Sequence, residues 1–223
     1  DDEIIRRLFY RNLRDPYARE WQGGTSRWDL FDPMRAAYAL RPDGIEWPKK
    51  KDGSISFRLE DLARANDVPH ENAHDALSDV KATIGVARVL KKAQPRLFDF
   101  SMTLRKKSNV SRILDPRKKQ PAVLISTRFK GKGKNLGLIL PLTYHPFKAN
   151  NIICFDLSYD PVLIKDSTDE SLSEYLTTYS SFFIEINISR VPFGAPVSVL
   201  GGDLNTDLEL DLGLVQKRTA ILN

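Results

Sequence analysis

Cysteine, histidine and long apolar runs are all scarce in this sequence. Its 223 residues include one cysteine, Cys154, which excludes an internal disulfide framework and favours a reducing cytoplasm. No apolar run approaches the ~20 residues that a membrane-spanning helix needs, so no membrane partner is expected. The chain begins at Asp1, without a start methionine or a signal peptide, which indicates a piece of a longer protein.

Only three histidines are present, and two of them lie within one short stretch, which allows three interpretations. His70, Glu71 and His74 match the H-E-x-x-H pattern of zinc proteases. However, Pro69 lies directly before the first histidine, and no glutamate that could act as a third ligand occurs between residues 71 and 170. A His-Asp dyad of the phosphohydrolase type, built on His74, would need further histidines, which this chain does not supply.

The third interpretation is the pattern H-x-A-x-x-D, formed by His74, Ala76 and Asp79. A helix is predicted from about residue 75 to 92, so Asp79 lies one turn inside it and His74 lies in its entry turn. Hydrolysis of a phosphodiester needs Mg²⁺ on hard carboxylate oxygens and a base that works near neutral pH. Asp79 and His74 supply one of each.

Charge is distributed unevenly, although the net charge is only +5. Residues 101–134 hold eleven lysines or arginines and one acid, whereas residues 156–211 hold eleven acids and two bases. Such a run is either a solvated face or a basic track for a polyanion.

The apolar periodicity divides the chain near Pro95. Before it, the period of 3.6 predicts helices at 1–13, 33–40, 58–66 and 75–92, the third capped by Ser56. The last of these helices has a predicted buried stripe that consists of Leu77, Val80, Ile84, Ala87 and Leu90. After it, alternation predicts strands at 123–129, 136–142, 152–157 and 182–189, with a further helix around 169–178. We expect two domains, residues 1–94 and 95–223.

Several stretches resemble bacterial exodeoxyribonuclease I, a family of the DEDDh (DnaQ-like) 3′→5′ exonucleases. Residues 72–79 are similar to the third exonuclease motif of that superfamily. The wider likeness lies in Phe9-Tyr10-Arg11-Asn12, Asp15-Pro16-Tyr17-Ala18, Ser26-Arg27-Trp28-Asp29-Leu30, Tyr38-Ala39-Leu40-Arg41-Pro42, Ser56-Phe57-Arg58-Leu59-Glu60 and Gln94-Pro95-Arg96-Leu97-Phe98-Asp99. It is strong over residues 1 to about 100 and fainter beyond. The resemblance implies an α/β, RNase H-like exonuclease core followed by a β-rich, SH3-like domain that clamps DNA and is truncated at its end here.

The resemblance also implies the roles of the catalytic residues. Asp79 matches the fourth acid, a metal ligand, and His74 matches the general base. Asp1 matches the third acid, with Asp2 as the alternative. The expected cofactor is a pair of Mg²⁺ ions, with Mn²⁺ as a substitute. The first two acids, an Asp-x-Glu on an opening strand, do not precede Asp1, and the family's later helical region is missing too, so we expect residues 1–223 alone to be inactive.

Single-stranded DNA, digested from its 3′ end in repair and recombination, is the substrate that this likeness implies, with single-strand-binding protein as a partner. Helix starts and turns place basic residues for phosphate contacts, and a Gly-containing loop places aromatic residues for stacking on bases. The predicted contacts are Arg58, Arg6, Arg35, Arg41, Tyr17, Trp21, Arg128, Lys130, Lys132 and Lys134. Each has a plainer interpretation, as a solvated helix residue or as half-buried core. A non-catalytic module that binds single strands is the alternative function.

Overall fold

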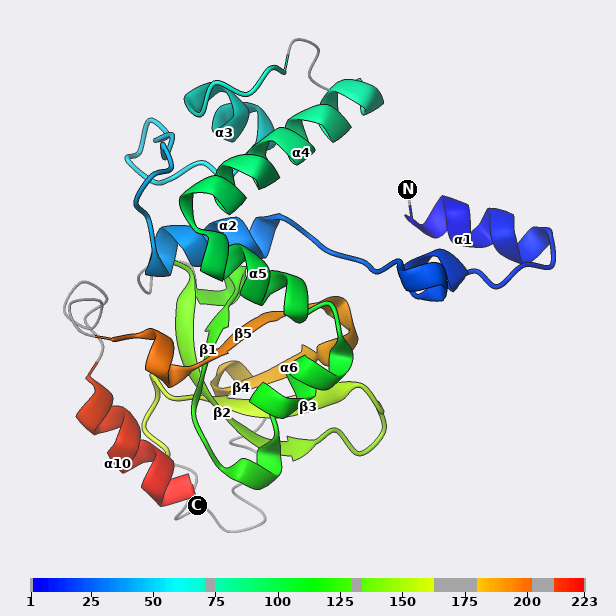
Figure 1. Cartoon of the computed structure of the whole chain (residues 1–223). Coiled ribbons are helices and arrows are strands. Elements are labelled where there is room, and N and C mark those ends of the chain that lie inside the picture. The colour runs from blue at the N-terminus through cyan, green and yellow to red at the C-terminus, as the bar shows by residue number, and fades with distance from the viewer. Residues whose placement is uncertain (1, 71–74, 130–133, 163–179, 202–210, 223) are drawn as a thin grey trace.

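A computed structural model describes residues 2–70, 75–129, 134–162, 180–201 and 211–222. Helices fill the first part of the chain and an antiparallel sheet fills the second (Figure 1). This order agrees with the prediction from the change of apolar period near Pro95. Among the described residues, no helix has both the length and the apolar character needed to cross a membrane.

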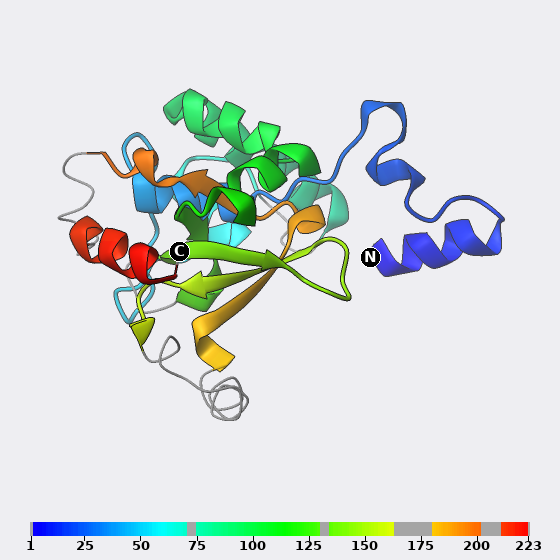
Figure 2. The same ribbon diagram turned by 90° about the horizontal axis from the view of Figure 1, so that it is seen from below.

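In the described part of the chain, six α-helices precede the sheet. They are α1 (Asp2–Arg11), α2 (Phe31–Leu40), α3 (Leu59–Ala65), α4 (Ala76–Ala93), α5 (Pro95–Thr103) and α6 (Lys107–Ile113). The side chain of Asp75 caps α4 by accepting a hydrogen bond from the backbone N–H of Ser78, which confirms a helix start at this point. Helix α1 stands away from the other helices and the sheet in both Figure 1 and Figure 2.

Over the ranges that the structure describes, the sheet has five antiparallel strands in the order β4-β3-β2-β1-β5. They are β1 (Ala122–Ile125), β2 (Leu136–Tyr144), β3 (Asn151–Asp156), β4 (Phe183–Asn187) and β5 (Phe193–Pro196). The register of β2 against β3 shifts between Pro141 and Thr143, which indicates a bulge. Helix α10 (Leu212–Leu222) follows the sheet, buries Val215 and Thr219, and donates a hydrogen bond from Arg218 to the carbonyl of Leu157.

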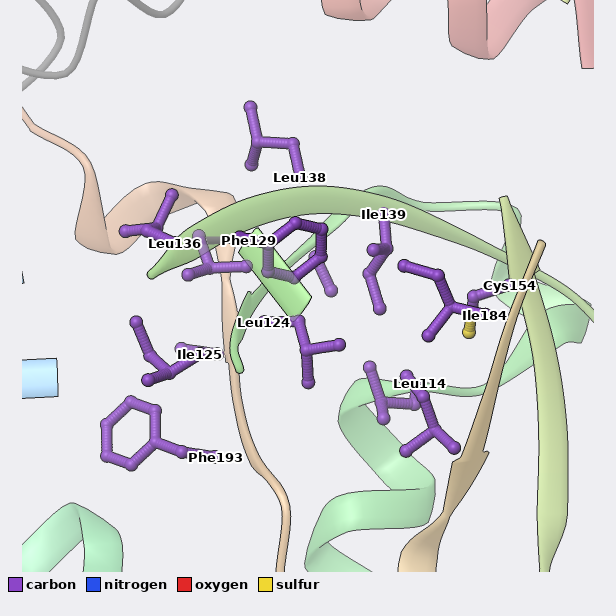
Figure 3. Packing of buried hydrophobic residues seen from close by; sticks show 14 of the residues in the cluster. Leu114, Leu124, Ile125, Phe129, Leu136, Leu138, Ile139, Cys154, Ile184 and Phe193 are labelled. Carbon is purple, nitrogen blue, oxygen red and sulfur yellow. The ribbon is translucent and has the colours of Figure 1, made fainter. Parts of the chain in front are cut away.

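The largest apolar cluster lies on the sheet and continues into α6 (Figure 3). Leu114, at the end of α6, points toward Leu124 and Ile139 on two neighbouring strands. Gly137 makes room for the ring of Phe129, since a Cβ added at this glycine would lie 2.3 Å from Cε1 of the ring. The thiol of Cys154 is completely buried in the same cluster, and burial raises its pKa.

A second apolar cluster joins α2, α3 and α4. It consists of Met34, Ala37, Ile45, Leu62, Ala63, Ala82, Val86 and Leu90. Helix α2 contributes to both clusters, because Ala36, Ala39 and Leu40 pack with the sheet while Met34 and Ala37 pack with α3 and α4. Small alanines on α2 allow this close approach on two sides.

The predicted buried stripe of α4 is wrong in its first half. Leu77, Val80 and Ile84 are 60%, 55% and 46% exposed, whereas Leu90 is completely buried. The reason is that α4 packs on α3 and α5 through Ala82, Val86 and Leu90, which are spaced four residues apart on a neighbouring face of the helix. The sequence offers two apolar faces, and only one of them is buried among the described residues.

Two expectations about helix ends are also wrong. Pro95 does not end the helices, because it occupies the first turn of α5, where its missing N–H costs nothing. Ser56 does not cap α3; its hydroxyl donates to Asp61, and Arg58 occupies the N-cap position. The helix expected around 169–178 lies outside the described residues.

Candidate nucleic-acid interface and metal-binding carboxylate

A cleft of about 640 Å³ lies between the helical part and the sheet domain. It is lined by α2, by the loop that leads to α3, and by the segment that precedes β2. Its lining residues are Phe31, Arg35, Tyr38, Lys50, Gly53, Ser54, Ile55, Phe57, Arg58, Thr127, Lys134 and Asn135. We call it the α2–α3 cleft. Four of these residues are basic and none of them is acidic.

One face of α2 forms the wall of this cleft. Phe31, Arg35 and Tyr38 are spaced by four and three residues, so they lie above one another on the same side of the helix. The other faces of α2 are buried in the two apolar clusters. Tyr38 makes an edge contact with Phe57, with ring centroids 5.9 Å apart. The cleft therefore has a fixed aromatic wall.

Cations lie on these aromatic rings. The guanidinium of Arg35 is 4.9 Å from the ring centre of Phe31, and the ammonium of Lys134 is 5.5 Å from that of Tyr38. The pairing of Lys134 with Tyr38 joins the second domain to the helical part across the cleft. Such alternation of cations and ring faces suits a strand of phosphates and bases.

Two of the cleft arginines also have acidic partners. Arg35 donates to Asp32 at 2.9 Å, and Arg58 pairs with Glu60 at 2.6 Å. Burial raises the pKa of Asp32 above its ordinary value, while the hydrogen bond from Arg35 opposes the rise. The side chain of Arg58 remains 68% exposed, so a phosphate can approach it from solvent.

A second pocket, of about 500 Å³, continues from the α2–α3 cleft toward α4. The two share Phe31 and Phe57, and the second also includes Thr83 and Val86 of α4. The hydroxyl of Thr83 donates to the backbone carbonyl of Asp79 at 2.8 Å, one helical turn earlier. The path of basic and aromatic residues thus ends about 6 Å along the helix axis from Asp79, at 1.5 Å per residue.

Asp79 lies in the first turn of α4, and its carboxylate is 42% exposed. Its Oδ1 is 2.8 Å from Nε2 of His70, whose side chain is only 5% exposed. A carboxylate in this setting is a hard oxygen donor of the type that Mg²⁺ prefers, so its chemistry fits that ion. Within the described ranges, no group of three or more histidine, cysteine, aspartate or glutamate residues could hold a metal. His74 and Asp1 lie outside those ranges.

The structure brings together some of the predicted contact residues and separates others. Arg35, Arg58 and Lys134 share the α2–α3 cleft. Arg6 and Tyr17 belong to the N-terminal segment that stands apart, where the guanidinium of Arg6 lies 4.9 Å from the ring centre of Tyr17 and pairs with Glu20 at 2.5 Å.

Three further residues have other surroundings. Trp21, in the N-terminal segment, is 62% exposed. Arg41 donates to the carbonyl of Val199 at 3.2 Å, which joins α2 to the second domain. Arg128 donates to the carbonyls of Ser181 and Phe183 at 2.7 and 3.0 Å. Lys130 and Lys132 lie outside the described residues.

Five members of the site are not among the residues that the sequence predicts to bind DNA or to act in the exonuclease site. Phe31, Tyr38, Lys50 and Phe57 line the cleft, and His70 contacts Asp79. Phe31 and Tyr38 could have been found from their spacing of four residues before and three residues after Arg35. The other three depend on loops whose course the sequence does not reveal.

Known proteins match both parts of this arrangement. A family model described as "Exonuclease I SH3-like domain" matches residues 105–223. Exodeoxyribonuclease I of Escherichia coli strain K12 is 48% identical over 180 residues, which cover 80% of this chain and 38% of that protein. The crystal structure of Escherichia coli exonuclease I in complex with a dA16 oligonucleotide matches with a TM-score of 0.90 and 39% identity, over 100% of this chain and 49% of that one.

Another solved structure, an ExoI/SSB-Ct complex, matches with a TM-score of 0.88 and 38% identity over 100% of this chain and 49% of that one. The chain spans about half the length, or less, of the curated relatives it matches. The second part of the chain is an SH3-like domain of the exonuclease type. The chain belongs to the exonuclease I family.

Proposed function

We propose that the intact protein carrying this chain is a Mg²⁺-dependent 3′→5′ exonuclease that degrades single-stranded DNA to 5′-mononucleotides. The observation that carries the proposal is the continuous path from the α2–α3 cleft, over Phe31 and Phe57, to Thr83 of α4. Thr83 lies one helical turn after Asp79 and donates to its backbone carbonyl. A cleft of cations and aromatic faces binds any sequence, because every base has a face and every linkage has a charge.

Each side chain has a role in this proposal. Arg58 and Lys134 neutralise phosphates of the strand, and Phe31 and Phe57 stack on its bases. Asp79 holds metal, together with Asp1 and carboxylates contributed from elsewhere in the intact protein. Bound Mg²⁺ supplies Lewis-acid stabilisation of charge on the reacting phosphodiester. His74 takes the proton from the attacking water.

Partners follow from the family as further parts of the proposal. An exonuclease I similar to this chain forms a complex with SSB-Ct, and we infer that single-strand-binding protein is a partner here too. Because its proposed substrate is single-stranded DNA, we infer that the intact protein acts in DNA repair and recombination. The single buried thiol of Cys154 is in keeping with the reducing cytoplasm.

The test uses the intact protein with Asp79→Ala and Asp99→Ala. Both are aspartates on helices with side chains that reach solvent, but Asp99 lies on α5 and not in the first turn of α4, where Asp79 contacts His70. Release of nucleotides from a 3′-labelled single-stranded oligonucleotide should fall by more than about 100-fold for Asp79→Ala, since it removes a ligand to the catalytic metal. Asp99→Ala should leave the rate unchanged.

Binding of the oligonucleotide, measured by fluorescence anisotropy, should survive in both variants. Nucleotide release at a near-normal rate by the Asp79 variant would refute the assignment. Tight binding by the parent protein without any release would favour the non-catalytic binding module. The zinc-peptidase alternative is disfavoured by His70, because its Nε2 is directed at Asp79.

A further inference from the structure

The buried imidazole of His70 lies directly against the carboxylate of Asp79. Nε2 and Oδ1 are 2.8 Å apart, with the histidine side chain 5% exposed and the aspartate side chain 42% exposed. The histidine therefore contacts the carboxylate from the protein interior, while the carboxylate remains accessible to solvent. We propose that His70 is a positioning residue, which fixes the orientation of the Asp79 carboxylate for metal binding.

The fold builds this contact from two sides. After α3 ends at Ala65, the chain turns at Asp67, whose φ of 54° lies in the left-handed region. The N–H of Val68 then donates to the carbonyl of Ala63 at 2.8 Å, which ties the segment to α3. Pro69 follows and restricts its own φ, so the direction of the chain into His70 is constrained.

The other anchor is on α4. Gly85 allows Val68 to lie directly on the helix, since a Cβ added there would be 2.3 Å from Cγ1 of Val68. Gly85 and Asp79 are on the same helix, so the contact at Gly85 sets the distance of the 66–70 segment from the helix that carries the carboxylate. His70 is thus held by backbone and packing contacts that do not depend on Asp79.

A carboxylate binds a metal more tightly when a fixed hydrogen-bond partner holds its orientation. Free rotation of the Asp79 side chain would spread its oxygens over several directions, and ordering it on binding would cost conformational free energy. A hydrogen bond to Oδ1 from a side chain that is already fixed removes part of that cost. Loss of such a partner lowers metal affinity by about 10–100-fold in other metal sites.

The proposal rests on the role of Asp79 in the proposed function. It also makes a prediction that differs from that of a purely structural role for His70 in packing. His70→Gln retains a nitrogen at nearly the position of Nε2, whereas the amide of His70→Asn is too short to reach Oδ1. Both variants replace the imidazole with a neutral amide, so they differ chiefly in whether the side chain reaches Oδ1 of Asp79. His145→Ala is the matched control, because His145 lies in the sheet domain with its Nε2 3.9 Å from Glu185.

The measurement is binding of Mn²⁺ to the intact protein, followed by the paramagnetic resonance of the free ion. His70→Asn should bind Mn²⁺ about 10–100-fold more weakly than the parent, while His70→Gln should stay within about threefold and His145→Ala should be unchanged. Thermal unfolding checks that each variant is folded. In the exonuclease assay, His70→Asn should need a correspondingly higher Mg²⁺ concentration and regain most of its kcat at saturation.

Equal Mn²⁺ affinity for the asparagine and glutamine variants would overturn the proposal. That result is distinct from a failure of the proposed function. If Asp79→Ala loses metal binding and activity while His70→Asn keeps both, only the positioning role is wrong. If Asp79→Ala keeps both, the metal assignment itself is wrong.

Discussion

Arg58 provides a quantitative test of the α2–α3 cleft. It occupies the N-cap position of α3, its side chain is 68% exposed, and it lines the cleft with three other bases, Arg35, Lys50 and Lys134. Each phosphate neutralised on a single strand contributes about 0.7 to the slope of log affinity against log salt. Four bases therefore contribute at most about 2.8, so raising the salt fourfold weakens binding by about 50-fold through this cleft.

Arg58→Ala should lower that slope by about 0.7, so the same rise in salt then weakens binding by about 18-fold. Arg64→Ala is the control, because Arg64 is on the same helix, is 80% exposed and is 3.8 Å from Asp61, but does not line the cleft. The assay is anisotropy of a labelled oligothymidylate between 50 and 200 mM salt, with chelator present to prevent cleavage. A slope unchanged in Arg58→Ala, or lowered equally in Arg64→Ala, would refute the assignment of the cleft.

Two further predictions concern stability. Gly137→Ala should destabilise the fold by about 1–3 kcal/mol or more in chemical denaturation, because its Cβ would lie 2.3 Å from the buried ring of Phe129; Gly201→Ala, with no atom within 4 Å, should have little effect. Hydrogen bonds from Arg117 hold the pKa of Asp115 well below its usual value, so this pair contributes stability above the unfolded-state pKa and loses it as the pH falls. Arg117→Ala should therefore reduce the loss of stability as the pH falls from about 5 to about 2, and an unchanged loss would contradict this role.

Local pattern predicted the regular elements well where one physical signal was dominant. The helix expected at 75–92 is α4 at Ala76–Ala93, and the four expected strands correspond to β1 through β4. Strand β5 was missed because Phe193-Gly194-Ala195-Pro196 has no alternation and contains two residues that disfavour strands. Its pairing with β1 at the edge of the sheet supplies what its sequence lacks.

The sequence predicted some of the residues that line the cleft, but not their arrangement. Arg35 and Arg58 were expected to contact phosphate, yet no spacing rule shows that residues on two helices line one cleft. The zinc-protease pattern offers too few ligands, so the sequence alone assigns no role to His70. Its contact with Asp79 depends on the close approach of Val68 to Gly85. This is a tertiary contact, which the sequence does not reveal.

Every face of helix α2 contributes either to an apolar cluster or to the α2–α3 cleft. Two sides are buried in the separate apolar clusters, and the third presents Phe31, Arg35 and Tyr38 to the cleft. Neither cluster can be opened without exposing a side of this helix, so the two parts of the chain should melt as one cooperative unit. The walls of the cleft are then already ordered before DNA binds. The conformational entropy lost on binding should therefore come mainly from the single-stranded DNA.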